Sequence, residues 1–342
     1  MDKILTIVIP TYNMEKYLRK CLDSLVVDYN VLFDKLEVLV VNDGSRDSSS
    51  AIAHEYQDNY PNVFRVIDKE NGNYGSCVNC GLKEANGKYI KILDADDSFD
   101  TRNFEEFLLL LAGVDVDLII SDFDIVSESG KIKRSFTYHL KPMVKGDFLD
   151  YVSTLKNIQM HAVTYKCENL KRINYFQTEG VSYTDLEWIF FPMTTVKTIC
   201  YFNKVVYKYL VGRSGQTVDY SVYHRRVLDR VKGTKTMIAE FKKDYLSIYK
   251  EYLEGKILGR LNGIYLSYLV VNREDSNMYE FDKYIEAELG GTIYEKMNEM
   301  NVAKFIIYRY IRRWRNTNML PPYYITSIYL IIKRIQIFLA RF

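Results

Sequence analysis

Short apolar runs and amphipathic stretches alternate through residues 1–121, and this alternation limits the folds open to the chain. The apolar runs predict strands at residues 4–9, 36–41, 63–68, 89–93 and 117–121. The stretches between them predict helices at residues 15–26, 49–60, 76–84 and 103–111. Strands that alternate with helices form a mostly parallel sheet covered by helices on both faces. We therefore expect an α/β fold.

Polar clusters follow three of the predicted strands. They are Pro10–Asn13 after the first strand, Asn42–Ser45 after the second and Asp94–Asp97 after the fourth. Ligands of open α/β sheets bind beyond the carboxyl ends of the strands. Three polar clusters at one edge of the sheet therefore predict a binding site there.

The third cluster contains three carboxylates within four residues, Asp94, Asp96 and Asp97. Unpaired carboxylates are costly to bury, so we expect this strand end to face solvent, a cation or both. Hard oxygen ligands suit Mg²⁺ or Mn²⁺, which in turn suit a diphosphate. The alternative is a charged turn before a helix that begins near Thr101.

Two common nucleotide-binding motifs are missing from the sequence. A dinucleotide fingerprint needs several glycines after the first strand, but Gly44 is the one glycine in the first sixty residues. A Walker-type phosphate loop is also absent from the sequence. The segment Asn71–Ser76, which contains Asn73, could present backbone N–H groups to an anion, and a plain turn explains it as well.

The motifs Ile7–Asn13, Val41–Ser45, Asn79–Gly81 and Leu93–Asp97, taken in this order, closely resemble the family 2 glycosyltransferases of GT-A fold. The resemblance covers roughly residues 4–215. It implies an enzyme that moves a sugar from a nucleotide diphosphate sugar with inversion at the anomeric carbon.

The resemblance also assigns roles to residues. The candidate donor-binding residues are Pro10, Thr11, Tyr12, Asp43, Asn73, Asp94, Asp96 and Arg213. Asp43 would hold the base and Asp96 the ribose, while Asp97 and Asp96 would bind Mn²⁺ or Mg²⁺. Many relatives carry an arginine where this chain has Val78, so the base itself stays open.

The segment around Asp185 resembles the part of the family that carries the catalytic base. Asp185 is our candidate base, and Glu187 is the alternative. Read from the residues alone, Ser182 or Thr184 could instead cap a helix whose positive end Asp185 and Glu187 favour. His161 could also reach the site, although a single histidine is more often structural.

Charge is unevenly distributed along the chain. The net charge is +2, yet residues 302–342 hold eight Lys or Arg and no acidic residue. Two amphipathic segments there, separated by Pro321 and Pro322, predict binding to an anionic membrane, with packing on the body as the alternative. Their broad apolar faces argue against nucleic acid. We expect domains at residues 1–221, 222–301 and 302–342, the second a helical extension.

The five cysteines form no disulfide framework. Cys77 and Cys80 lack a second cysteine pair and are expected to be small packing residues. Without an apolar run of about 18 residues to span a bilayer, we expect a cytoplasmic protein that is peripheral on the inner face of the membrane.

The sequence thus predicts a metal-dependent transferase that uses a nucleotide diphosphate sugar, preferably a UDP-sugar, and a glycan or lipid-linked acceptor. A nucleotidyltransferase and a non-catalytic membrane adaptor are the alternatives. The donor sugar, the acceptor, the linkage and the oligomeric state stay open.

Overall fold

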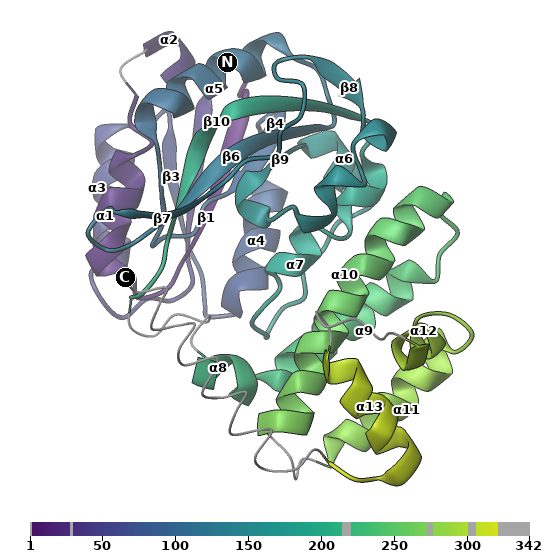
Figure 1. The fold of residues 1–342 in the computed structure, drawn as a ribbon. Coiled ribbons are helices and arrows are strands. Elements are labelled where there is room, and N and C mark those ends of the chain that lie inside the picture. The colour runs from purple at the N-terminus through teal and green to yellow at the C-terminus, as the bar shows by residue number, and fades with distance from the viewer. Residues whose placement is uncertain (1, 28–29, 214–219, 272–275, 300–305, 321–342) are drawn as a thin grey trace. The chain divides into compact units, whose positions relative to one another are not determined.

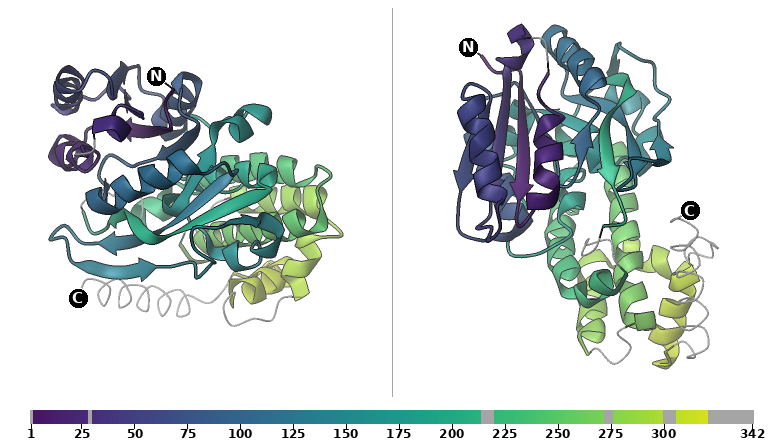
Figure 2. Two further views of the ribbon diagram at one scale, coloured as in Figure 1. Left: turned by 90° about the horizontal axis from the view of Figure 1, so that it is seen from above. Right: turned by 90° about the vertical axis from the view of Figure 1, so that its left-hand side faces the viewer.

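The computed structural model of the chain describes residues 2–27, 30–213, 220–271, 276–299 and 306–320. The chain divides into two compact units, residues 1–213 and residues 214–342. A mixed sheet with flanking helices forms the first unit, and helices form the second (Figure 1, Figure 2).

One mixed sheet organises the first unit. Its strands are β1 (Leu5–Thr11), β2 (Leu36–Asn42), β3 (Phe64–Asp68), β4 (Tyr89–Ile92), β5 (Ser98–Phe99), β6 (Leu118–Val126), β7 (Ile132–Phe136), β8 (Lys145–Asp147), β9 (Val163–Lys166) and β10 (Thr198–Leu210). The spatial order is β3-β2-β1-β4-β9-β6-β10-β5, with β7 paired to β6 and β8 to β10. Parallel pairs join β3-β2-β1-β4 and β6-β10, and β9 runs antiparallel between the two groups.

The α-helices of this unit lie mostly between the parallel strands in sequence. They are α1 (Glu15–Asp23), α2 (Asn30–Phe33), α3 (Ser49–Asn59), α4 (Asn73–Glu84), α5 (Thr101–Gly113), α6 (Cys167–Arg172) and α7 (Asp185–Trp188). Short 3₁₀ turns are η1 (Phe148–Asp150), η2 (Thr154–Asn157), η3 (Met160–Ala162) and η4 (Pro192–Thr195). The predicted α/β fold is confirmed, including a strand at each of the five positions named in the sequence analysis.

Every residue of β1 and β2 is buried, as expected for parallel strands covered on both faces. Helix α4 packs on these two strands. Gly81 permits this contact, because a Cβ there would lie 2.4 Å from a methyl group of Val8. The close packing fixes where α4 begins, and that end borders the candidate site described below.

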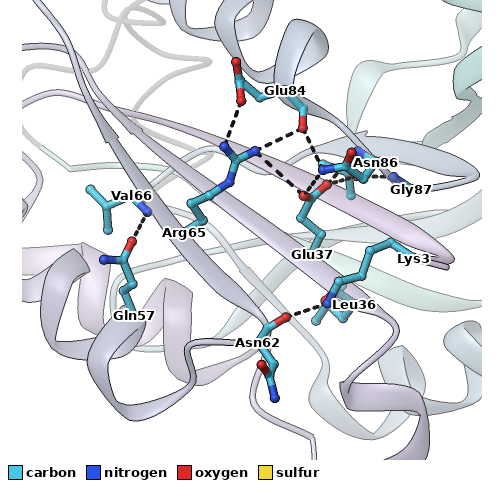
Figure 3. A network of polar contacts seen from close by, with 11 residues as sticks. Lys3, Leu36, Glu37, Gln57, Asn62, Arg65, Val66, Glu84, Asn86 and Gly87 are labelled. Carbon is cyan, nitrogen blue, oxygen red and sulfur yellow. Dashed lines mark hydrogen bonds and ion pairs between the residues drawn. The ribbon is translucent and has the colours of Figure 1, made fainter. Parts of the chain in front are cut away.

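A polar network closes the opposite, amino-terminal edge of the sheet (Figure 3). The buried carboxylate of Glu37 accepts hydrogen bonds from the hydroxyl of Thr6 at 2.6 Å and the backbone N–H of Asn86 at 2.9 Å. Arg65 binds Glu84 at 2.8 Å beside it. The network is satisfied by its own members, so we assign it a structural role.

The second unit is helical in its described residues. Its elements are α8 (Tyr220–Arg225), α9 (Val227–Phe241), α10 (Ser247–Leu266), the π-helical η5 (Ser267–Val271), α11 (Asn277–Leu289), α12 (Ile293–Glu299) and α13 (Ile306–Thr317). The helical extension expected after residue 221 is therefore helical in its described residues. None of the helices in the described ranges combines the length and apolar character that crossing a bilayer requires.

The structure corrects the prediction for the first basic amphipathic segment. Part of its apolar face is buried within the helical unit, because Tyr308, Ile311 and Trp314 lie where α13 packs on α10 and α12. The side chain of Arg315 is largely buried, and its guanidinium binds Asp282 at 2.7 Å. Contacts within the helical unit thus bury apolar residues of this segment and pair one of its positive charges. The second segment, residues 321–342, lies outside the described residues.

Candidate active site

The loops after β1, β2 and β4 meet at the carboxyl edge of the sheet, because these strands are parallel neighbours. The backbone N–H of Asp43 donates to the carbonyl of Thr11 at 2.8 Å. The N–H of Arg46 donates to the side chain of Asn13 at 2.8 Å. These contacts tie the first two polar clusters together beside the third.

Tyr12 is the exposed aromatic residue of the first cluster, with 43% of its surface accessible. Pro10 and Thr11 are buried in β1. The hydroxyl of Thr11 donates to the carbonyl of Ile9 at 3.1 Å. Of these three candidates, Tyr12 is therefore the one placed to stack on a planar base.

Asp43 anchors the start of α4. Its carboxylate accepts hydrogen bonds from Lys69 at 2.6 Å and from the backbone N–H groups of Gly72 and Asn73, each at 2.9 Å. The N–H of Asn73 is thus committed to Asp43. Asn73 also has a positive φ of 69°, which an asparagine tolerates better than most residues. These hydrogen bonds of Asp43 therefore fix the position of the first residues of α4.

The acidic cluster is more enclosed than the sequence predicts. Asp94 is half-buried and accepts a hydrogen bond from the hydroxyl of Tyr74 at 2.8 Å. Asp97 is only 2% exposed, and it accepts from the hydroxyl of Tyr207 and the N–H of Leu210, both at 2.6 Å. Asp97 itself therefore does not face solvent, and donors from β10 compensate its burial.

Asp97→Ala should lower the free energy of unfolding of the first unit by about 3 kcal/mol, because the buried donors of Tyr207 and Leu210 would lose their acceptor. Urea unfolding without divalent metal, followed by the fluorescence of the buried Trp188 in a Trp314→Phe background, measures this. Asp97→Asn is the matched control and should lose about half as much, since its amide oxygen still accepts one bond. An alanine variant as stable as the parent would contradict this role.

His161 joins this acidic cluster from η3. One ligand atom from each of Asp94, Asp97 and His161 lies within 4.8 Å of the others. The imidazole is 8% exposed, its ring centroid lies 4.4 Å from that of Tyr209, and its Nδ1 has no hydrogen-bond partner among the described residues. Carboxylate oxygens with one imidazole suit Mn²⁺, so these residues fit a divalent cation.

Burial shifts the pKa values of Asp94, Asp97 and His161 in the direction that favours the neutral form of each side chain. Burial, with the negative charge of Asp96 second, raises the pKa of Asp94 to about 7. Burial and the charges of Asp96 and Asp94 also raise the pKa of Asp97 well above its usual range. Burial lowers the pKa of His161 to about 3, so its ring is neutral and able to ligate. A bound dication would favour the ionised carboxylates.

Asp96 is paired with another sequence candidate, Arg213. The guanidinium Nε lies 2.5 Å from the carboxylate, and both side chains are largely buried. Arg213 also lies over the ring of Tyr17 on α1, 5.6 Å from its centroid. The residues expected to contact ribose and diphosphate therefore contact each other in this structure.

Asp185 and Glu187 occupy different environments on α7. Asp185 is exposed at the first residue of the helix. Helix α7 contacts η3, which carries His161, and the negative charge of Asp185 contributes to the raised pKa of both Asp94 and Tyr74, so Asp185 lies near the cluster. Glu187 is fully buried, and its carboxylate accepts from the N–H of Thr178 at 2.8 Å.

The capping alternative for this segment is not supported for Thr184. Its side chain makes no cap hydrogen bond to α7. Instead its hydroxyl accepts a hydrogen bond from Gln177 at 2.8 Å. Val78 is fully buried and can supply no group to a base.

Comparison with known proteins identifies a family for part of the chain. Residues 6–166 match the family described as "Glycosyl transferase family 2". The match covers just under half of the chain and lies within the first unit. The predicted fold class is confirmed, and the matched domain is of the family that the motifs resemble.

Curated relatives include Glycosyltransferase GlyA of Streptococcus pneumoniae, which is 24% identical over 285 residues, covering 77% of this chain and 39% of GlyA. Putative glycosyltransferase EpsH of Bacillus subtilis is 38% identical over 118 residues, covering 34% of this chain and 33% of EpsH. The chain thus spans about two fifths or less of the length of these relatives.

Solved structures show the same fold. Staphylococcus aureus TarS 1–349 in complex with UDP-GlcNAc superposes with a TM-score of 0.64 at 15% identity, covering 92% of each chain. The mannosyltransferase PcManGT of Pyrobaculum calidifontis, in complex with GDP-Man and Mn²⁺, gives 0.53 at 17% identity, covering 91% of this chain and 87% of that one. At this identity the likeness describes the fold.

Proposed function

We propose that this family 2 glycosyltransferase moves one sugar, with inversion, from a nucleotide diphosphate sugar to a hydroxyl of a glycan or lipid-linked glycan. The observation that carries the proposal is the contact of α7, which begins at Asp185, with η3, whose His161 lies beside Asp94 and Asp97 at the carboxyl edge of the sheet. Asp185 would supply a proton acceptor, and the cluster would supply ligands for a metal that binds the diphosphate.

The residues divide into binding and reacting groups. Tyr12 would stack on the base, and Asp43 would accept from its polar edge. Arg213 would exchange Asp96 for the donor diphosphate, which releases Asp96 toward the ribose. Asp94, Asp97 and His161, with Asp96 beside them, would hold Mn²⁺ or Mg²⁺. Such a cation stabilises charge on the leaving diphosphate.

Transfer breaks the bond between the anomeric carbon and the diphosphate oxygen and forms a bond to the acceptor oxygen. The exposed carboxylate of Asp185 would take the proton from the acceptor hydroxyl as that oxygen attacks. Attack from the face opposite the leaving group gives inversion. Glu187 is less suited to this role, because Thr178 and burial hold it inside the unit.

A panel of sugar nucleotides with Mn²⁺, read by mass spectrometry, tests the proposal and identifies the donor. We expect one or two donors, with UDP-sugars first, to be slowly hydrolysed in a metal-dependent way without acceptor. Donor binding without any turnover would favour the adaptor function. Turnover of nucleoside triphosphates instead of sugar nucleotides would favour a nucleotidyltransferase.

We also propose that the protein binds the inner face of an anionic membrane, now through residues 321–342. This segment holds three Lys or Arg and no acidic residue, with isoleucines at helical spacing. Removing residues 321–342 should abolish co-sedimentation with anionic vesicles at low salt while keeping donor hydrolysis, because α13 stays in place. Full-length protein that ignores such vesicles would contradict the proposal.

A further inference from the structure

The hairpin strand β7 carries an arginine whose surroundings fit none of the roles assigned so far. β7 pairs with β6 alone among the described strands. Between Glu128 and Asp147 the chain holds five Lys or Arg and no acidic residue. Arg134 is exposed in this basic segment and has no acidic partner among the described residues.

A continuous row of rings connects Arg134 to the candidate active site. Its guanidinium lies over Phe136, 4.4 Å from the ring centroid. Phe136 stacks on Phe123 at 4.6 Å, with only 6° between the ring planes. The ring centroids of Phe123 and His161 lie 5.1 Å apart. Arg134 therefore stands a few ring widths from the acidic cluster.

The register of the sheet explains why this row lies on one face. Phe123 pairs directly with Phe136, and Ile125 pairs with Arg134. Side chains two residues apart point to the same face of a strand, so Arg134 and Phe136 share a face. The other half of the same edge of β6 pairs with β9, which follows His161. The row of rings therefore begins at the point on β6 where its pairing with β9 ends and its pairing with β7 begins.

The stacking prepares Arg134 for an anion. A guanidinium held by one face on a ring keeps its N–H edges free for oxyanions, and less rotamer freedom is lost on binding. Arginine in this setting forms charge-assisted hydrogen bonds to phosphate or carboxylate. Helix α7, which begins at the proposed base Asp185, contacts η3, the turn that carries His161. Strand β7 pairs with the last residues of β6, so Arg134 lies toward the same edge of the sheet as the acidic cluster.

We infer that Arg134 is an acceptor-binding residue that recognises an oxyanion, so the acceptor is an anionic glycan carrying phosphodiester or carboxylate groups. This inference rests on the proposed function, because the acceptor is defined by the transfer reaction. It adds the chemical class of the acceptor. The position of Arg134 places the anionic group away from the reacting hydroxyl.

Fluorescence anisotropy of a labelled oligo(glycerol phosphate) with full-length protein, Mn²⁺ and UDP tests the inference. Arg134→Glu should weaken binding at least about tenfold, or about 1.4 kcal/mol, and Arg134→Lys should weaken it less. Lys197→Glu is the matched control, since Lys197 is exposed just before β10, at the opposite edge of the sheet. It should change binding less than about twofold.

Further probes distinguish the possible sources of the negative charge that Arg134 binds. An oligogalacturonate replaces phosphodiesters by carboxylates and distinguishes the two acceptor chemistries, while an oligo(ethylene glycol) should not bind. Equal weakening by Arg134→Glu and Lys197→Glu, or no oligomer binding at all, would overturn the inference. So would an effect of Arg134→Glu confined to phosphatidylglycerol vesicles, which would assign β7 to a membrane surface.

The same samples separate this inference from the proposed function. Binding of UDP with Mn²⁺ and hydrolysis of the donor are measured for the parent and for each variant. A parent that binds no sugar nucleotide contradicts the proposed function. A parent and an Arg134→Glu variant that hydrolyse donor equally and bind the oligomer equally contradict the role of Arg134 alone.

Discussion

Asp185→Asn will lower the rate of sugar transfer at least about a hundredfold, the usual scale for a lost general base, and will leave donor affinity unchanged. Asparagine keeps the shape of the side chain but cannot take the acceptor proton. Asp185 is exposed at the start of α7, so we expect the fold to tolerate this substitution. Single-turnover transfer and UDP binding, measured on the same variant, separate the lost chemistry from lost binding.

Glu187→Gln is the matched control, two residues further along α7. Its side chain is fully buried and accepts from the N–H of Thr178, so the substitution should cost stability more than rate. Rates are therefore normalised to the folded fraction. A near-parental Asp185→Asn enzyme beside an inactive Glu187→Gln enzyme would show that Glu187 is the base and that the segment is matched to the family two residues out of place.

Asp94→Asn will lower the affinity for Mn²⁺ by at least about a hundredfold, because it removes one anionic ligand from a site of three. Asparagine can still accept the hydrogen bond from Tyr74, so the local packing is kept. Free Mn²⁺ measured by electron paramagnetic resonance reports this affinity without any turnover. The added thermal stabilisation by UDP with Mn²⁺ should disappear in parallel.

Tyr74→Phe separates the charge of Asp94 from its hydrogen bond. It removes the hydroxyl that Asp94 accepts from and leaves all the carboxylates, so Mn²⁺ affinity should fall by about tenfold, the scale of a ligand's supporting contact. His161→Ala should resemble Asp94→Asn. Parental Mn²⁺ affinity in both Asp94→Asn and His161→Ala would place the metal elsewhere, with Asp96 as the first choice.

The sequence by itself determined the order of the main elements and the edge where the chemistry lies. Strand periodicity and β-branched runs are local properties, and the carboxyl ends of parallel strands must share an edge. The motifs around Asp43 and Asp94–Asp97 were therefore enough to bring the candidate site residues to one edge of the sheet. The antiparallel strands β7, β8 and β9 were not predicted, because they are short and lack a clear alternating pattern.

Only the tertiary structure decided the environment of each side chain. Burial of Asp97 depends on Tyr207 and Leu210, more than a hundred residues away. His161 reaches the acidic cluster because η3 precedes a strand that runs between β4 and β6. The stripe of α13 looks like a membrane face in sequence, and it is buried because α10 and α12 offer it an apolar partner. Periodicity shows which side chains share a face, but pairing, burial and charge compensation depend on what lies opposite that face.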